Sequence, residues 1–500
     1  MKAFLMFGDR DLNPNLELPF HEEILVQDLE LRTLFNAMAI DQADLFDVVR
    51  KVVLSSLTEV DDILYRQKIL KDCLKNPAII RDIYHIAVET IETRRKHHLG
   101  SVLFNYPSTI LYGSVQLMQF FVDMLKKLKN TADQHAGEFE SEGFKAFFEM
   151  IKKELDDDYF ARIQYHLKEL QFRDGVLISA QLTNGNVGSQ YVLRKPNDKK
   201  GNWMKRVFSK RSPVFTFSIH PRDEGGARAL SELRDCGINL VANALAQSAE
   251  HILSFFNMLK LELSFYVGCL NLYDQLVQLG EPISFPLPVP SNERKHSFKG
   301  LYDISLALTI KHQVVGNDLN CDKKDLVIIT GANQGGKSTF LRSIGLAQLM
   351  MQCGMFVPAE SFCANICENI FTHFKRKEDP TMKSGKLDEE LSRMSDILDH
   401  MNINSMVLFN ESFAATNERE GTEIARQIVS ALIEKHIKVY FVTHLYEFAH
   451  CFYEKKMENV LFLRAERKIE GKRTYKIKEG EPLQTSFGED LYKKVFGRAS

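Results

Sequence analysis

A glycine-rich run that ends in lysine and serine carries the clearest chemical signal in this sequence. Residues 331–338 are Gly-Ala-Asn-Gln-Gly-Gly-Lys-Ser, the G-x-x-x-x-G-K-S spacing of a phosphate-binding loop. Glycines let successive backbone N–H groups point into one concavity, where they hold phosphate oxygens. Lys337 would reach the β- and γ-phosphates of a nucleotide, and the Ser338 hydroxyl would bind Mg²⁺. The predicted nucleotide contacts are Gly331, Ala332, Asn333, Gln334, Gly335, Gly336, Lys337, Ser338 and Thr339.

The segments on either side of this loop are those that a nucleotide site needs. Residues 326–329 form an apolar, β-branched run, which favours a buried strand. After the loop, apolar residues recur at helical spacing, so the loop would end at a helix N-terminus, which favours anions. A chance glycine loop is the alternative, and the strand and helix in register disfavour it. The apolar residues of the predicted helix are Phe340, Leu341, Ile344, Leu346 and Leu349.

Two further apolar strands end in polar residues that suit nucleotide hydrolysis. The first, residues 405–409, leads into Asn410 and Glu411. In ATPases with this loop, an acid at the strand end holds the Mg²⁺ shell, and here the neutral Asn410 takes that place. Glu411 is placed to orient and activate the attacking water. The second strand, residues 438–442, leads to His444, which could sense the γ-phosphate or simply be a hydrogen-bonded strand end.

These predictions assign a chemical role to each polar strand end. The predicted catalytic residues are Glu411 and His444, and the predicted Mg²⁺ ligands are Ser338 and Asn410.

The order of these motifs resembles the ATPase domain of the MutS family, a branch of the ABC-type ATPases. The matching segments are residues 314–318, 330–339, 352–360, 406–411 and 441–444. In the first half of the chain, residues 26–39 look like the start of the MutS helical core, and residues 263–272 look like its end. The resemblance implies ATP with Mg²⁺ as ligands, Asn317 near the nucleotide, and a composite site in a homodimer.

Three features of the sequence bear on which properties of the family apply to this chain. Asn410 replaces the family's aspartate, which questions the strength of Mg²⁺ binding and the rate of ATP hydrolysis. Ser384 is the candidate for the serine that caps the partner subunit's γ-phosphate from the start of a helix over residues 384–398. Roughly 25 residues precede the core, below the ~50-residue minimum for a domain, so we expect no N-terminal mismatch-recognition domain.

A basic segment near the middle of the chain is the candidate DNA contact. Residues 175–182 and 188–193 flank Asn-Gly-Asn, a hairpin signal, and residues 214–220 are a third strand candidate. Between them, residues 194–211 hold eight basic residues and one acid, a formal charge of +7. A solvated loop anchored by its tryptophan is the alternative. MutS proteins place a DNA clamp in such an insertion, which favours DNA contact through Lys199, Lys200, Trp203, Lys205, Arg206, Lys210 and Arg211.

The composition limits the remaining possibilities. The hydrophobic fraction of 44% and the charged fraction of 26% are ordinary for globular chains. A net charge of −2 gives no general affinity for nucleic acid, so DNA contact would need a local patch. Eight scattered cysteines favour reduced thiols and a cytoplasmic location. The sequence has no run of 18 apolar residues, so we expect no membrane partner.

We therefore predict a multidomain protein with an all-α core and lever helices, a small β insertion and an α/β P-loop ATPase domain of the ABC type. The predicted parts are a helical core and lever (1–174), a basic clamp-like insertion (175–222), returning lever helices (223–285) and the ATPase domain (286–500).

The functional hypothesis is an ATP-dependent DNA-binding protein of the MutS type. ATP binding and hydrolysis in a dimer would switch its grip on DNA, in a structure-dependent or non-specific way, in mismatch repair or related repair or recombination. One alternative is an ABC-superfamily ATPase with another cargo, disfavoured because no Leu-Ser-Gly-Gly-Gln run is present. Another is a nucleotide-gated clamp with little turnover, which Asn410 supports.

Overall fold

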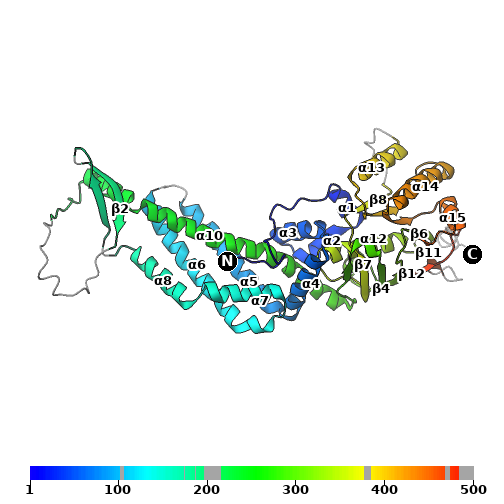
Figure 1. Cartoon of the computed structure of the whole chain (residues 1–500), viewed down its shortest axis with the longest axis horizontal. Helices are drawn as coiled ribbons and strands as arrows, with labels where there is room; N and C mark the ends of the chain where they lie inside the picture. The colour runs from blue at the N-terminus through cyan, green and yellow to red at the C-terminus, as the bar shows by residue number, and fades with distance from the viewer. Residues whose placement is uncertain are drawn as a thin grey trace, which may run out of the picture. The chain divides into compact units, whose positions relative to one another are not determined.

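The computed structural model describes residues 1–101, 106–173, 175–185, 187–195, 215–376, 385–467 and 473–483 (Figure 1). It divides into two compact units. Unit 1 comprises residues 1–3, 81–139 and 145–260, and unit 2 comprises residues 4–80, 140–144 and 261–500. The result is a multidomain α/β protein, rich in helix, with separate sheets. The four-part division made from the sequence stays a prediction.

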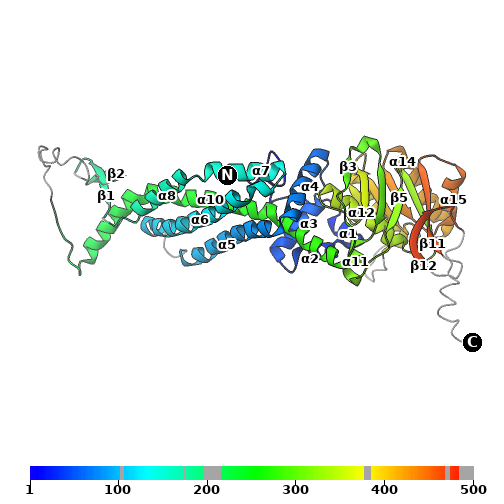
Figure 2. The same cartoon turned by 90° about the horizontal axis from the view of Figure 1, so that it is seen from below.

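Unit 1 is built mainly from long helices. Figure 2 shows α6, α8 and α10 running side by side. Pro107 occupies the first turn of α6, where its missing N–H costs nothing. Asp156 caps α8 by accepting the Tyr159 N–H at 2.6 Å, so the run of acids at Asp156–Asp158 is a helix start. The elements of unit 1 are α6 (Pro107–His135), η1 (Ala136–Glu138), α8 (Asp157–Glu169) and the larger parts of α5 (Pro77–Ser101), α7 (Glu142–Glu154) and α10 (Glu224–Leu279), whose remaining residues belong to unit 2.

The predicted hairpin is present in unit 1, but the prediction of a third strand at residues 214–220 is wrong. Strands β1 (Leu177–Leu182) and β2 (Gly188–Arg194) pair antiparallel, and Gly185 between them has a φ of +90°, which favours glycine. Residues 215–220 form no strand. Phe215 and Phe217 alternate as in a strand, but they are 88% and 83% exposed, and the hairpin's sheet contains two strands.

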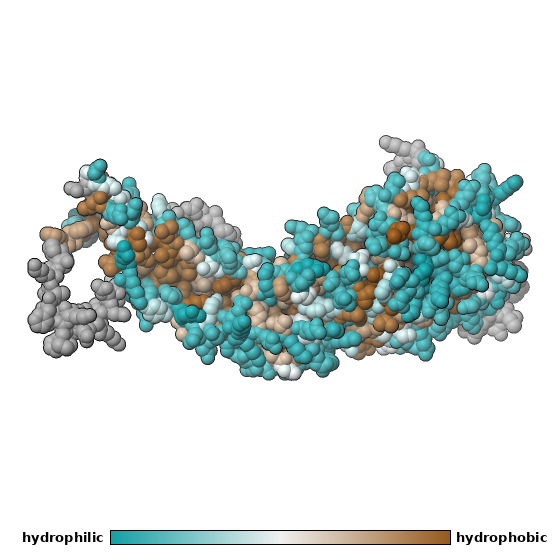
Figure 3. Space-filling model, viewed as in Figure 1, coloured by the Kyte–Doolittle hydropathy of each residue, from teal (hydrophilic) through white to brown (hydrophobic). Residues whose placement is uncertain are grey.

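Apolar side chains are exposed near the hairpin. Figure 3 shows a brown patch in this part of unit 1. A pocket of about 890 Å³ lies there, and its apolar lining comes from α6, the segment between α8 and β1, β1 itself and α10. These apolar residues include Leu111, Tyr112, Val115, Ile178, Leu230 and Leu233.

One feature of α10 resembles a membrane-spanning helix. It contains an 18-residue window with a mean hydropathy of 1.2, although no continuous apolar run of that length occurs. Because 67% of the window is buried inside the structure, the composition fits a core helix.

Unit 2 combines a small helical part with two sheets. Its first helices are α1 (Glu22–Asp28), α2 (Leu31–Ala39), α3 (Ala43–Leu54) and α4 (Val60–Lys75). The six-stranded sheet has the order β12-β11-β6-β10-β9-β8, and the four-stranded sheet has the order β3-β7-β4-β5. The predicted strands at residues 326–329, 405–409 and 438–442 are confirmed as β6 (Leu326–Gly331), β9 (Met406–Asn410) and β10 (Lys438–Val442).

The six-stranded sheet is parallel except at one edge. Strands β11 (Val460–Arg467), β6, β10, β9 and β8 (Ile370–Phe374) pair in parallel, and β12 (Arg473–Glu479) adds antiparallel to β11. Strands of this kind are buried on both faces, and β6 and β10 are buried at every position.

The helices of unit 2 pack around these sheets. They are α11 (Ile304–Ile310), α12 (Lys337–Gln352), α13 (Lys386–His400), α14 (Glu418–Glu434), α15 (Tyr446–Glu454) and the short η2 (Ser291–Glu293). The second sheet contains β3 (Leu287–Val289), β4 (His296–Leu301), β5 (Asn317–Asn320) and β7 (Ser361–Asn365).

A buried carboxylate fastens the N-terminal segment within unit 2. Glu262, on α10, is fully buried and accepts the backbone N–H groups of Leu5 and Leu12, each at 2.7 Å. Desolvation raises the pKa of Glu262 to about 7, although the two N–H groups favour its charged form. The side chain therefore anchors the chain start while changing protonation near neutral pH.

Glu262 should make the stability of the protein depend on pH. Its pKa in the folded protein, about 7, exceeds the ordinary value of 4.5, so the folded state holds the proton more tightly. That stabilisation is complete below pH 4.5 and is lost as the pH rises towards 7. We expect Glu262→Gln to lower stability at pH 5, because an amide leaves one N–H without an acceptor, and to remove this pH dependence, which amounts to about 2 kcal/mol between pH 5 and pH 7. The free energy of urea unfolding at pH 5, 6 and 7 measures this pH dependence.

The exposed Glu59→Gln is the matched control and should keep the wild-type pH dependence. Equal pH dependence in wild type and Glu262→Gln would contradict the assignment.

Candidate nucleotide-binding site

The predicted phosphate loop lies between β6 and α12, as the sequence required. Gly336 precedes α12 with a φ of +90°, and Gly331 ends β6 with a φ of +109°. A Cβ atom on Gly331 would lie 2.9 Å from the backbone N of Ala465, and one on Gly335 would lie 2.7 Å from the Ala465 Cβ. The loop therefore needs glycine both for its backbone angles and for its close approach to β11.

Lys337 is held over the concavity of the loop. Its ammonium donates to the carbonyl oxygens of Gly331 and Ala332, each at 3.0 Å. Burial lowers the pKa of Lys337 to about 8, and the nearby Glu411 opposes this shift. A phosphate bound in the loop would favour the charged form of Lys337, because an opposite charge raises the pKa of an amine.

The carboxyl ends of β9 and β10 bring the other predicted polar residues beside the loop. The Ser338 hydroxyl donates to the side-chain oxygen of Asn410 at 2.9 Å. The His444 Nε2 lies 3.0 Å from Glu411 Oε1. The hydrogen bond from His444 lowers the pKa of Glu411, and the charge of Lys337 acts in the same direction. Glu411 is therefore ionised at neutral pH, and the structure brings all five residues together.

The predicted contact Asn317 serves a neighbouring strand. Its side-chain oxygen accepts the Ile477 N–H at 2.7 Å, and its amide nitrogen donates to the Tyr475 carbonyl at 3.4 Å. Asn317 thus fixes β12 next to the loop. Tyr475, which the sequence did not indicate, is 52% exposed there, and a Cβ on Gly336 would lie 3.6 Å from Tyr475 Cβ.

Comparison with known proteins agrees with this geometry. The sequence model for the MutS2 N-terminal domain matches residues 58–279, and that for MutS domain V matches residues 327–495. The chain belongs to the MutS family. The second match contains the phosphate loop, the strand end at Asn410 and the strand before His444.

Individual MutS relatives match parts of the chain. The DNA mismatch repair protein MutS of Parabacteroides distasonis is 32% identical over 320 residues, which is 59% of this chain and 35% of the relative. That of Thermotoga maritima is 33% identical over 214 residues, 42% of this chain and 26% of the relative. MutS protein homolog 4 of Homo sapiens is 31% identical over 152 residues, 30% of this chain and 16% of the relative. The matches thus span about a third or less of these relatives.

Several predicted residues cannot be placed in this MutS-family structure. Ser384 lies outside the described residues, although the helix predicted to follow it is present as α13. All seven predicted DNA contacts also lie outside the described residues: Lys199, Lys200, Trp203, Lys205, Arg206, Lys210 and Arg211. At the described edge of the basic segment, Arg194 Nε donates to Ser179 Oγ at 2.8 Å, and the Lys195 ammonium lies 5.0 Å from the Tyr165 ring centre.

A second layer of buried side chains, absent from the sequence predictions, supports Glu411. The next residue, Ser412, is fully buried and its Oγ lies 2.8 Å from Nδ1 of His373. Burial lowers the pKa of His373 to about 4, so this ring is neutral at pH 7. Glu390, on α13, accepts the Phe413 N–H at 2.9 Å. The turn after Glu411 is therefore tied to β8 and to α13.

The remaining residues of the loop also have assigned positions. Ala332 is buried, and Asn333 presents its carbonyl oxygen to Arg473 Nε at 3.2 Å. Gln334 is exposed with a φ of +57°, and Thr339 is half-buried on α12. Arg473 was not predicted, because its position depends on the β11–β12 pairing.

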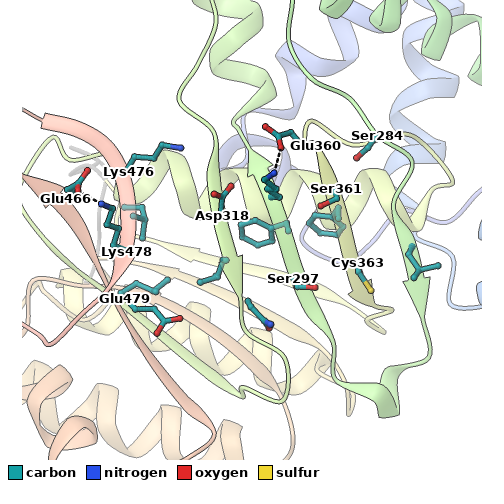
Figure 4. A pocket seen from close by; sticks show the side chains of 18 of the residues that line it. Ser284, Ser297, Asp318, Glu360, Ser361, Cys363, Glu466, Lys476, Lys478 and Glu479 are labelled. Carbon is teal, nitrogen blue, oxygen red and sulfur yellow. Dashed lines mark hydrogen bonds and ion pairs between the residues drawn. The ribbon is translucent and has the colours of Figure 1, made fainter.

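A separate pocket of about 1060 Å³ lies in unit 2 and contains none of the phosphate-loop residues. Figure 4 shows its side chains projecting from strands of the four-stranded sheet and from β12. The Lys299 ammonium lies 3.2 Å from Glu360, and Lys478 pairs with Glu466. Two ion pairs among its own lining residues thus offset part of the charge of this pocket.

The close approach of the loop to β11 gives a stability prediction. Gly335→Ala should lower the free energy of unfolding by about 2 kcal/mol, because its Cβ would displace Ala465 and the Ala332 carbonyl. Urea unfolding of the variant measures this loss.

Gly137→Ala, within η1, is the matched control, because no atom lies within 4 Å of its added Cβ. A Gly335→Ala variant as stable as this control would show that the loop is not packed against β11.

Proposed function

We propose that this protein is an ATP-dependent, DNA-binding ATPase of the MutS type, acting as a dimer in mismatch repair or a related repair or recombination process. The observation that carries the proposal is the convergence of Lys337, Ser338, Asn410, Glu411 and His444 at one sheet edge. Two of the relatives named above, those of Parabacteroides distasonis and Thermotoga maritima, are DNA mismatch repair proteins, which supports the DNA part.

The site has oxygen donors that suit Mg²⁺ arriving with ATP. Ser338 Oγ and Asn410 Oδ1 are 2.9 Å apart. Neighbouring ligands of an octahedral Mg²⁺, each at about 2.0–2.1 Å, are separated by about 2.9 Å. Both donors are neutral, and the described residues hold no group of three His, Cys, Asp or Glu fit for a metal. Phosphate oxygens would therefore supply the negative ligands, and the bound ion would offset phosphate charge.

Each of these protein groups would have a separate role in ATP hydrolysis. The loop N–H groups and Lys337 hold the β- and γ-phosphates. A water adds to the γ-phosphorus, the bond to the β–γ bridging oxygen breaks, and Glu411 takes the water proton. His444 orients Glu411 through their 3.0 Å contact. Tyr475, exposed next to the loop, offers a surface for the base.

A composite site would link nucleotide to dimerisation and DNA. The start of α13 with Ser384 would approach the partner subunit's nucleotide, as the family resemblance implies. The basic segment beyond the β1–β2 hairpin would contact the DNA backbone, because its charge suits phosphates of any sequence. A nucleotide-gated clamp with slow turnover remains the second candidate, because Asn410 adds no charge to the Mg²⁺ site.

Hydrolysis should depend on Glu411 but ATP binding should not. Glu411→Gln keeps shape and hydrogen bonding while it removes the base, so we expect ATP binding near wild-type affinity and a loss of turnover of about 10²-fold or more. Lys337→Ala, which removes the charge over the loop, should abolish binding itself. Equilibrium ATP binding and steady-state phosphate release measure the two effects.

Normal turnover by Glu411→Gln would show that another residue activates the attacking water. Wild-type ATP affinity in Lys337→Ala would refute the nucleotide site.

DNA binding should be electrostatic and insensitive to sequence. Neutralising Lys199, Lys200, Lys205 and Arg206 together should weaken binding to all duplexes alike. It should also flatten the salt dependence by about 0.9 of a logarithmic unit for each DNA phosphate that the variant no longer neutralises. Fluorescence anisotropy at several salt concentrations measures the slope. An unchanged slope would show that the segment is a solvated loop that does not contact DNA. A strong preference for one mismatch would indicate a different mode of recognition.

A further inference from the structure

A second pocket adjoins the phosphate loop within unit 2. Its volume is about 590 Å³, and Ser338 and Asn410 form part of its wall. The other lining residues come from α1 and the turn after it, from α12 and α13, and from the end of β8 and the two residues that follow it. Its charged residues are Asp28, Glu30, Arg342, Lys375, Arg376 and Glu389.

The carboxylates of this pocket are all engaged by arginines. Asp28 pairs with Arg376 at 3.0 Å, and Glu30 pairs with Arg342. Glu389 lies 3.4 Å from Nε of Arg393, on the next turn of α13. An arginine therefore already offsets the charge of each of the three carboxylates.

Lys375 is the lining cation that has no carboxylate partner among the described residues. It follows β8 directly, and its backbone N–H donates to the Asn410 carbonyl at 2.9 Å. The β8–β9 pairing thus places Lys375 beside the residue that stands at the Mg²⁺ position. Its charge also reaches Glu411, whose pKa it lowers after the larger effects of His444 and Lys337, and it acts in the same direction on the pKa of Glu390.

The neutral Asn410 and the nearby Lys375 both make the site less negative than a site with an aspartate at the strand end. Mg²⁺ in nucleotide sites is commonly held by carboxylates together with phosphates, and here the strand end supplies a neutral amide. A lysine ammonium is a compact point charge on a flexible stem and readily binds phosphate oxygens. The pocket therefore places the Lys375 ammonium near Asn410, the position at which a negative ligand for Mg²⁺ is missing.

We propose that Lys375 is a phosphate-binding residue that neutralises the β- and γ-phosphates of ATP, so that this protein binds ATP with little dependence on Mg²⁺. The inference rests on the proposed ATP site and adds a residue to it. It also separates binding from hydrolysis: ATP can enter the site without the metal, while hydrolysis still draws on Glu411.

The test is ATP binding by isothermal titration calorimetry, with Mg²⁺ and with excess EDTA. Wild type should lose no more than about threefold in affinity when Mg²⁺ is removed. Lys375→Gln should lose about tenfold or more in EDTA and much less with Mg²⁺, because the metal then takes over the charge. Lys375→Gln/Asn410→Asp should show the strongest Mg²⁺ dependence, because the restored carboxylate needs the ion.

Lys435→Gln is the matched control, because it removes an exposed lysine at the end of α14, which precedes β10. It should behave as wild type in both buffers, and thermal melts check that each variant is folded. A wild type whose ATP affinity falls 100-fold in EDTA would overturn the role of Lys375, as would Lys375→Gln with wild-type affinity in EDTA. A wild type that binds no ATP even with Mg²⁺ would instead refute the proposed function, and this inference with it.

Discussion

The parallel pairing of β6, β10 and β9 is the constraint on which the site depends. Parallel strands bring their carboxyl ends to one edge, so residues far apart in sequence meet there. The 2.9 Å contact of Ser338 with Asn410 and the 3.0 Å contact of Glu411 with His444 both follow from this register. A slip of one residue would turn these side chains to the opposite face of the sheet.

Unit 2 also links this edge to its helical part through buried polar contacts. Arg66, on α4, is fully buried and donates to the carbonyl oxygens of Met6 at 3.0 Å and Cys353 at 3.4 Å. Asp28, on α1, pairs with Arg376 just after β8. A shift of β8 or α12 would strain these contacts, because a buried charge that loses its partner is costly. Helices α1 and α4 are thus joined by buried contacts to α12 and β8, which flank the edge that carries the phosphate loop.

The sequence predicted the parts of the site that depend on local pattern. The glycine spacing located the loop, and apolar runs located the strands that end at Asn410 and Val442. It missed residues whose position depends on pairing: Tyr475 reaches the loop through the β11–β12 pair, and Lys375 through the β8–β9 register. The strand predicted at residues 214–220 failed because alternation alone supplies no partner strand. Glu262 gave no signal, since its role depends on backbone N–H groups about 250 residues away.

In the function proposed above the nucleotide state controls the grip on DNA, and linkage makes this control measurable. The most direct measurement is the dissociation constant of the full chain for duplex DNA at fixed salt, with ADP and with a slowly hydrolysed ATP analogue. We expect the two dissociation constants to differ by about fivefold or more. Equal constants, with both nucleotides shown to be bound, would contradict it.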